Sequence, residues 1–117
     1  MSGSQRFQDT VLLITNNGIG HANVELQHKL LDTYLRLLVE NNDLPAAICF
    51  YTEGVKLVVK GSSFIDRLQA IEARGVRLII CSTCLNYFNL TDAAVGIVGS
   101  MADIMEAQAR AGKVITL

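Results

Sequence analysis

The chain has 117 residues, of which 50% are apolar and only 18% are charged, and its formal net charge is −1. A chain of this length forms one compact domain and is too short for two ordinary ones. Basic residues are scattered and aromatic residues are few, so the sequence predicts no nucleic-acid-binding surface. The apolar residues exceed what a monomer of this size easily buries, which predicts a homo-oligomer.

The sequence carries no recognisable membrane or secretion signal. No apolar run approaches the roughly 20 residues of a membrane span. The polar start MSGSQRFQDT lacks the basic-then-apolar pattern of a secretory signal. Three cysteines form an odd set, which is typical of reduced thiols. We therefore expect a cytoplasmic protein, with a loose amino terminus over residues 1–10 and a single domain over 11–117.

The first apolar run, residues 11–15, predicts a strand, and the glycine-containing loop NNGIGHAN follows it. This loop resembles a phosphate-binding loop but departs from the G-x-G-x-x-G spacing at its last position. Asn17, Gly18 and Gly20 are candidate anion-binding residues at the start of the next helix. The alternative is that the glycines only permit a tight turn.

Periodic apolar residues predict a helix over residues 23–40, with Asn23 as its cap. A second strand is predicted over 46–51, where Cys49 belongs to the core. The segment that follows, TEGVKLVVKGSS, holds Lys56 and Lys60. It is either an ordinary solvated loop or a source of positive charge that favours a nearby thiolate.

A second helix is predicted over residues 63–74, where Ser63 and Asp66 have the spacing of a capping box. The third apolar run, 76–80, predicts a strand that ends at LIICSTCLNYF. The two cysteines of this stretch, Cys81 and Cys84, are three residues apart at the carboxyl end of the predicted strand.

A short helix beginning at the cysteines favours a low-pKa thiol, because unpaired amides at a helix amino terminus stabilise a thiolate. Such a thiol can carry a persulfide, form a mixed disulfide or close with its neighbour. Inert packing is one alternative. A zinc site is another, which His21 or His28 and a further ligand would have to complete, and we expect no metal. A thioredoxin-like role lacks a cis-proline candidate near the pair. His21 is also a candidate proton carrier.

The remaining runs complete the pattern. Strands are predicted over residues 94–98 and 114–117, with a helix over 101–111 between them that begins at a capping box of Ser100 and Asp103. Alternating strands and helices predict an α/β fold, a three-layer sandwich with a mainly parallel five-stranded sheet. Functional residues of such folds lie in loops at the carboxyl ends of the strands.

The chain from Val11 to Leu117 resembles the DsrE-like superfamily, and within it the carboxyl-terminal domain of YedF-type sulfurtransferase-like proteins of selenium metabolism. The resemblance rests on EGVKL followed by GSS, on the C-x-T-C-L-x-Y segment, and on VGIVGSMADIMEAQARAGKVITL. The loop NNGIGHAN departs from it, because the family tends to be more acidic there.

The resemblance implies a homo-oligomer that relays sulfur, or selenium, without a resident cofactor. Cys81 would bear the persulfide and Cys84 would be its partner thiol, with Lys56, Thr83 and His21 in support. Donor and acceptor proteins are implied, with a TusA-like protein as a candidate donor. The alternatives are a non-catalytic oligomeric binding module and a dithiol redox protein.

Overall fold

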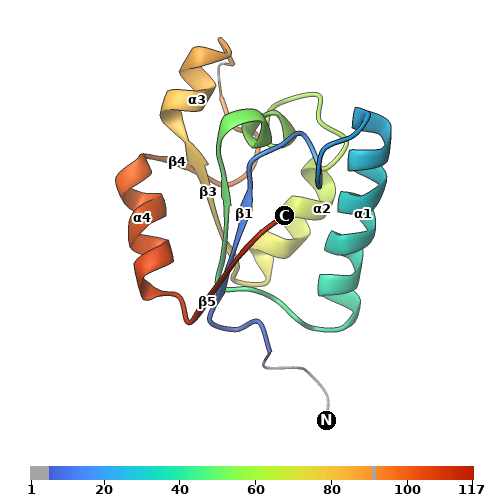
Figure 1. Cartoon of the computed structure of the whole chain (residues 1–117), viewed down its shortest axis with the longest axis vertical. Helices are drawn as coiled ribbons and strands as arrows, with labels where there is room; N and C mark the ends of the chain where they lie inside the picture. Colours follow the sequence, from blue (N-terminus) through green and yellow to red (C-terminus); the bar gives the residue numbers. More distant parts are fainter. Residues whose placement is uncertain (1–5, 91) are drawn as a thin grey trace.

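The computed structural model describes residues 6–90 and 92–117. At its centre is a sheet of five parallel strands in the order β4-β3-β2-β1-β5 (Figure 1). The strands are β1 (Thr10–Ile14), β2 (Ala47–Phe50), β3 (Arg77–Cys81), β4 (Ile97–Gly99) and β5 (Lys113–Thr116). The predicted α/β fold with a parallel five-stranded sheet is therefore confirmed.

Helices cover both faces of the sheet. α1 (Val24–Glu40) and α2 (Ile65–Ala73) lie on one face, and α4 (Met101–Arg110) lies on the other (Figure 1). The short helix α3 (Ser82–Tyr87) and the 3-10 helix η1 (Thr52–Leu57) contact each other at the carboxyl ends of the strands. Among the described residues, no helix combines the length and the apolar character needed to cross a membrane.

The core lies on both sides of the central strands. Every residue of β1 and β2 is buried, which explains why their sequences are continuous apolar runs rather than alternating ones. Leu12, Ile48 and Leu78 are 0% exposed. Burying one such side chain contributes about 1.5–3 kcal/mol, so these strands form the most stable part of the sheet.

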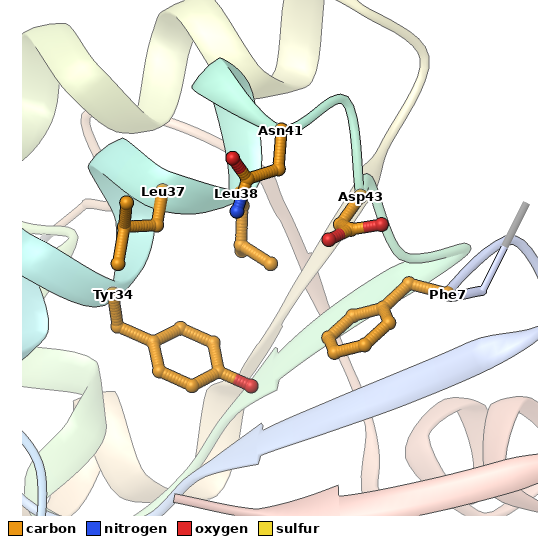
Figure 2. A pocket seen from close by; sticks show the side chains of 6 residues that line it. All are labelled: Phe7, Tyr34, Leu37, Leu38, Asn41 and Asp43. Atoms are coloured by element: carbon orange, nitrogen blue, oxygen red, sulfur yellow. The ribbon is translucent and has the colours of Figure 1, made fainter. Parts of the chain in front are cut away.

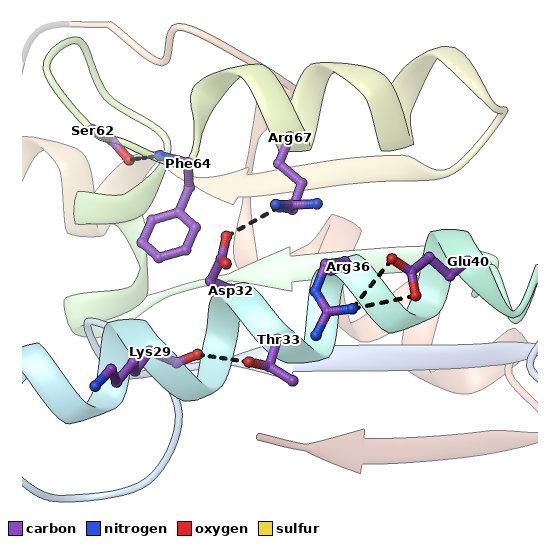
Figure 3. A network of polar contacts seen from close by, with 8 residues as sticks. All are labelled: Lys29, Asp32, Thr33, Arg36, Glu40, Ser62, Phe64 and Arg67. Carbon is purple, nitrogen blue, oxygen red and sulfur yellow. Dashed lines mark hydrogen bonds and ion pairs between the residues drawn. The ribbon is translucent and has the colours of Figure 1, made fainter.

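Polar contacts between α1 and α2 lie outside this core (Figure 3). The Arg67 guanidinium donates to the Asp32 carboxylate across the two helices at 3.2 Å. Arg36 and Glu40 pair within α1, also at 3.2 Å. Exposed pairs of this kind contribute only about 0–1 kcal/mol, so apolar packing rather than charge holds the helices on the sheet.

The fourth strand, Ile97–Gly99, is shorter than the predicted strand 94–98 and begins three residues further along the chain. The run 94–98 contains Gly96, whose φ of +85° is incompatible with a strand. A Cβ at Gly96 would lie 2.4 Å from Cδ1 of Ile80 and 2.9 Å from the Leu78 carbonyl oxygen, so the backbone runs too close to β3 for a side chain to fit without a shift. The Ala94 N–H donates to the Val58 carbonyl at 2.7 Å instead of joining the sheet.

One predicted capping box is present and the other is not. The Ser100 hydroxyl accepts from the Asp103 N–H, and the Asp103 carboxylate accepts from the Ser100 N–H at 2.8 Å. At α2, the helix starts after Phe64, whose N–H donates to the hydroxyl of Ser62 at 3.1 Å. Ser63 makes no capping hydrogen bond there, because Phe64 and not Ser63 occupies the N-cap position of α2.

The expected loose amino terminus, residues 1–10, lies partly outside the described residues, which begin at Arg6. Phe7 packs against the core, and its carbonyl accepts from the Thr10 N–H at 2.9 Å. Arg6 forms an ion pair with the buried carboxylate of Asp43. These contacts tie the described part of this segment to the start of β2.

Candidate functional site

The cysteine pair lies at the carboxyl edge of the sheet. Cys81 is the last residue of β3, next to Gly99 of β4, and α3 begins at the following residue. Cys81 is 1% exposed, whereas Cys84, one helical turn later, is only partly buried. The strand packs the first sulfur into the core, and the helix carries the second to the surface.

The Cys84 sulfur accepts a hydrogen bond from a backbone amide of another segment. The Thr52 N–H donates to Cys84 Sγ at 3.0 Å. Thr52 has a φ of +49°, a left-handed conformation that is rare for a β-branched residue. Its hydroxyl donates to the carbonyls of Thr15 and Tyr51, which hold the residue in that conformation. η1 and α3 therefore meet at the Cys84 sulfur, and Thr52 links this contact to the residue that follows β1.

Gly54 allows η1 to lie this close to the sheet. It is buried, and a Cβ at this position would lie 2.1 Å from the carbonyl oxygen of Ile14. Real Cβ atoms do not approach backbone so closely, so a side chain here would push η1 away from β1. The glycine of the TEG sequence is therefore required by this close approach rather than by an unusual backbone angle.

The electrostatics of Cys84 correct the expectation of a low-pKa thiol. Burial raises the pKa of Cys84 above its ordinary value, the Thr52 N–H opposes this, and the neighbouring Cys81 side chain raises it further. The predicted helper Lys56 bonds the Glu53 carboxylate at 2.7 Å. Lys56 does not contribute to the shift of the Cys84 pKa, and burial, the largest cause, decides its direction.

Cys84 opens into a pocket of about 370 Å³. The pocket is lined by Thr52 and Glu53 of η1 and by residues of α3 and its end, namely Thr83, Cys84, Tyr87 and Phe88. The Lys56 ammonium lies 4.6 Å from the centre of the Phe88 ring, at the rim. The structure thus brings together the predicted residues Cys81, Cys84 and Thr83, with Lys56 beside them.

The loop NNGIGHAN is not part of this pocket. Side-chain amides of Asn16 and Gln27 donate to the Gly20 carbonyl, at 2.9 and 2.5 Å. The Asn17 side chain contacts His28 at 3.0 Å. Gly18 has a φ of +131°, and a Cβ there would collide with the α1 backbone. The loop's own hydrogen bonds and its turn geometry account for these residues, and anion binding at Asn17, Gly18 and Gly20 stays a prediction.

The predicted histidines lie apart from the cysteines. His21 is exposed and contacts Asn16 at 3.5 Å, and it does not line the cysteine pocket. The His28 ring packs edge-on against the Phe64 ring, with the ring centres 5.1 Å apart. This contact holds His28 away from the cysteine pair. The contacts of His21 therefore do not support a role as proton carrier, and that role stays a prediction.

A second pocket lies at the amino ends of the strands (Figure 2). Its volume is about 160 Å³, and it is lined by Phe7, Tyr34, Leu37, Leu38, Asn41 and Asp43. Burial raises the pKa of Tyr34, and Asp43 is paired with Arg6. None of the lining residues is a ready nucleophile, so this pocket offers less chemistry than the one at Cys84.

Sequence reasoning missed four residues of the cysteine site: Thr52, Gly54, Tyr87 and Phe88. Tyr87 and Phe88 follow Cys84 by three and four residues, a spacing that places side chains on one face of a helix and could have identified them. Thr52 and Gly54 carried no such signal, because their roles depend on where η1 meets β1 and α3.

Comparison with known proteins shows the family of the chain. Residues 8–117 match the family model of the DsrE/DsrF-like family. The chain therefore belongs to the DsrE/DsrF-like family. No match was found among curated proteins.

Two solved structures share the fold. One is MTH1491 from Methanobacterium thermoautotrophicum, described as a protein of unknown function, with a TM-score of 0.69, 19% identity, and coverage of 95% of this chain and 99% of that one. The other is the ychN protein of E. coli, with a TM-score of 0.67, 15% identity, and coverage of 94% and 100%. At these identities the likeness concerns the fold.

Proposed function

We propose that this protein relays sulfur as a persulfide, and that Cys84 is the thiol that receives it. The main support is that a donor can reach only Cys84: it lines the pocket, whereas Cys81 is 1% exposed and Cys49 is 0% exposed. Membership of the DsrE/DsrF-like family supports a sulfur relay. The finer resemblance to YedF-type proteins adds selenium as an alternative cargo.

The transfer needs no external oxidant or reductant. The Cys84 thiolate attacks the outer sulfur of a donor persulfide R–S–SH, a bond forms to Cys84 Sγ, and the donor S–S bond breaks. The electron pair leaves with the donor as R–S⁻, and Cys84 becomes Cys–S–SH. An acceptor thiolate then attacks the same outer sulfur and regenerates the Cys84 thiolate.

This assignment exchanges the roles that the sequence predicts for the two cysteines. A donor cannot reach Cys81 in the described conformation, because the sulfur is packed into the core. Cys81 is instead the inner partner of Cys84, whose pKa its side chain raises. A thiol with a raised pKa is less often ionised, but its thiolate is the stronger nucleophile. The Thr52 N–H supports the negative sulfur at the moment of attack.

The deciding experiment is intact-protein mass spectrometry after incubation with a persulfide donor. Wild type, Cys81→Ser, Cys84→Ser and Cys49→Ser are compared, the last as the buried control. We expect wild type to gain the mass of one sulfur atom, and only Cys84→Ser to lose this gain. Loss of the gain with Cys81→Ser alone would instead make Cys81 the acceptor and contradict our assignment.

A dithiol redox function is the second candidate, because Cys81 and Cys84 lie one helical turn apart at the junction of β3 and α3, and Cys81 raises the pKa of Cys84. It predicts the loss of two hydrogen atoms without added sulfur, and a disulfide that reopens with a dithiol reductant. A binding module, the third alternative, predicts neither mass change, and partner binding that survives Cys84→Ser. The same spectra therefore distinguish all three.

A further inference from the structure

The pocket beside Cys84 limits which molecule can bring sulfur to it. Two aromatic rings, Tyr87 and Phe88, follow Cys84 on the same face of α3 and line the pocket. The rings meet edge to face, with their centres 5.2 Å apart. Tyr87 is 80% exposed, so its ring presents a large apolar face to solvent next to the sulfur. Exposed aromatic rings of this kind are common contact points for ligands and partners.

The charges at the pocket disfavour an anion. None of the described residues that line it is basic, and Glu53 is acidic. The nearby cation, Lys56, bonds the Glu53 carboxylate at 2.7 Å and lies over the Phe88 ring at 4.6 Å. An anionic donor would therefore lose hydration beside the Glu53 carboxylate and would have to compete with that carboxylate for Lys56.

We infer that, given the proposed sulfur relay, the site takes persulfides R–S–SH whose group R is uncharged and apolar beside the sulfur. Tyr87 holds R while Cys84 attacks the outer sulfur. The donor leaves as R–S⁻, so atoms and electrons balance as in the relay itself. A peptide segment and a free low-mass compound can both supply this chemistry.

The test compares initial rates of sulfur loading from four donors, measured by intact mass. Thiosulfate and glutathione persulfide are the anionic probes. Benzyl persulfide is the apolar low-mass probe, and the persulfide of acetyl-phenylalanyl-cysteine amide is the peptide probe. We expect both apolar probes to load at least about tenfold faster than both anionic ones. The ratio between the apolar probes distinguishes a protein carrier from a low-mass one.

Variants at the pocket test whether the Tyr87 ring causes the preference for apolar donors. Tyr87→Ala should slow both apolar donors by about tenfold and leave thiosulfate unchanged, whereas Tyr87→Phe, the matched control, keeps the ring and the rate. Because Tyr87 is exposed, neither substitution should unfold the protein, and circular dichroism checks this. Thr83→Lys adds a cation at the pocket and should speed thiosulfate. Equal rates for all four donors, with no effect of Tyr87→Ala, would overturn the inference.

A binding measurement separates this inference from the relay. The unreactive probe is acetyl-phenylalanyl-S-methylcysteine amide, which resembles the apolar donor but cannot transfer sulfur. We expect it to slow alkylation of Cys84 in wild type and not in Tyr87→Ala. If no donor loads sulfur but this probe still protects Cys84, the relay fails and the apolar selectivity stands. If the probe gives no protection, the selectivity is wrong.

Discussion

Three cysteines of one chain differ mainly in how far each sulfur lies from water. Cys49, in the middle of β2, is 0% exposed, and burial raises the pKa of Cys49 to about 11, a shift that Arg77 slightly opposes. Cys84 lies at the pocket, where burial raises the pKa of its thiol and the Thr52 amide opposes the rise. Reactivity should therefore follow access first and ionisation second.

The first prediction concerns alkylation of the native protein by iodoacetamide. Cys84 should react first and Cys49 last, and the rate at Cys84 should rise about tenfold per pH unit until its raised pKa is passed. Peptide mapping at several pH values measures this order. In urea the three thiols should become equivalent. A native Cys81 that reacts as fast as Cys84 would contradict the role that we assign to burial.

The second prediction concerns stability at alkaline pH. The folded pKa of Cys49, about 11, lies above the ordinary value of 9.0, so the folded state keeps its proton while the unfolded thiol ionises. Its contribution is complete below pH 9 and is lost as the pH rises toward 11, by at most about 2–3 kcal/mol. Urea unfolding at pH 8 and pH 10.5 should show a larger loss for wild type than for Cys49→Ala. Equal losses would mean that other groups cause the pH dependence.

At the scale of the elements, the helices differ in whether a side chain caps the amino terminus. α4 begins with a full capping box, and the pKa of the Asp103 carboxyl is lowered by the hydrogen bond from the Ser100 N–H. α2 begins without a side-chain cap, although its sequence has similar spacing. The difference arises because the turn before α2 uses Ser62 to bond the Phe64 amide.

The third prediction is that Ser100→Ala destabilises the protein by about 1 kcal/mol, because an amide at the start of α4 loses its acceptor. Ser63→Ala is the matched control and should change the free energy of unfolding by less than about 0.5 kcal/mol. Urea unfolding measures both. A similar cost for the two variants would mean that Ser63 caps α2 in solution.

The fourth prediction concerns the seat of η1. Gly54→Ala should cost about 1–3 kcal/mol, because its Cβ would meet the carbonyl of Ile14. The displaced Thr52 amide should no longer bond the Cys84 sulfur, which should raise the pKa measured from the pH profile of Cys84 alkylation. Gly61→Ala is the control for backbone strain without a collision, because its φ is +97° while a Cβ there meets nothing within 4 Å; it should cost stability and leave this profile unchanged. An unchanged profile in Gly54→Ala would contradict the positioning role of η1.

For the molecule as a whole, apolar side chains remain exposed on both sides of the sheet. One group lies on β4 and α4, namely Ile97, Val98, Met101 and Met105, with exposures of 45–63%. The other lies on α1, namely Leu26, Leu30 and Leu37, with exposures of 40–48%. α1 and α4 are on opposite faces, so the two groups are well separated (Figure 1). Exposed apolar surface of this kind supports the expected homo-oligomer.

The fifth prediction is that self-association depends on these surfaces. Met105→Glu and Leu30→Glu should each lower the mass measured by light scattering, because a buried charge would be unpaired in the interface. Glu106→Gln, an exposed change on the same helix, is the control. If both groups form contacts, one variant alone will leave a smaller oligomer or a monomer. A wild type that is already monomeric would refute the expectation.

The layered α/β architecture and the position of the cysteines at a strand end could be predicted from the sequence, because both depend on local patterns. Buried parallel strands need continuous apolar runs, and helices need periodic ones. The predicted bounds of the fourth strand, residues 94–98, were wrong because Gly96 approaches Ile80. This contact joins segments that are far apart in the chain.

Which cysteine faces the pocket, and how readily its thiol ionises, depend on packing between distant segments. Cys81 is buried by neighbouring strands, and Cys84 meets an amide 32 residues earlier in the chain. Burial and long-range hydrogen bonds arise from packing, and no spacing along the sequence encodes them. For the same reason, the raised pKa of Cys84 could be derived only after η1, α3 and β3 were placed together.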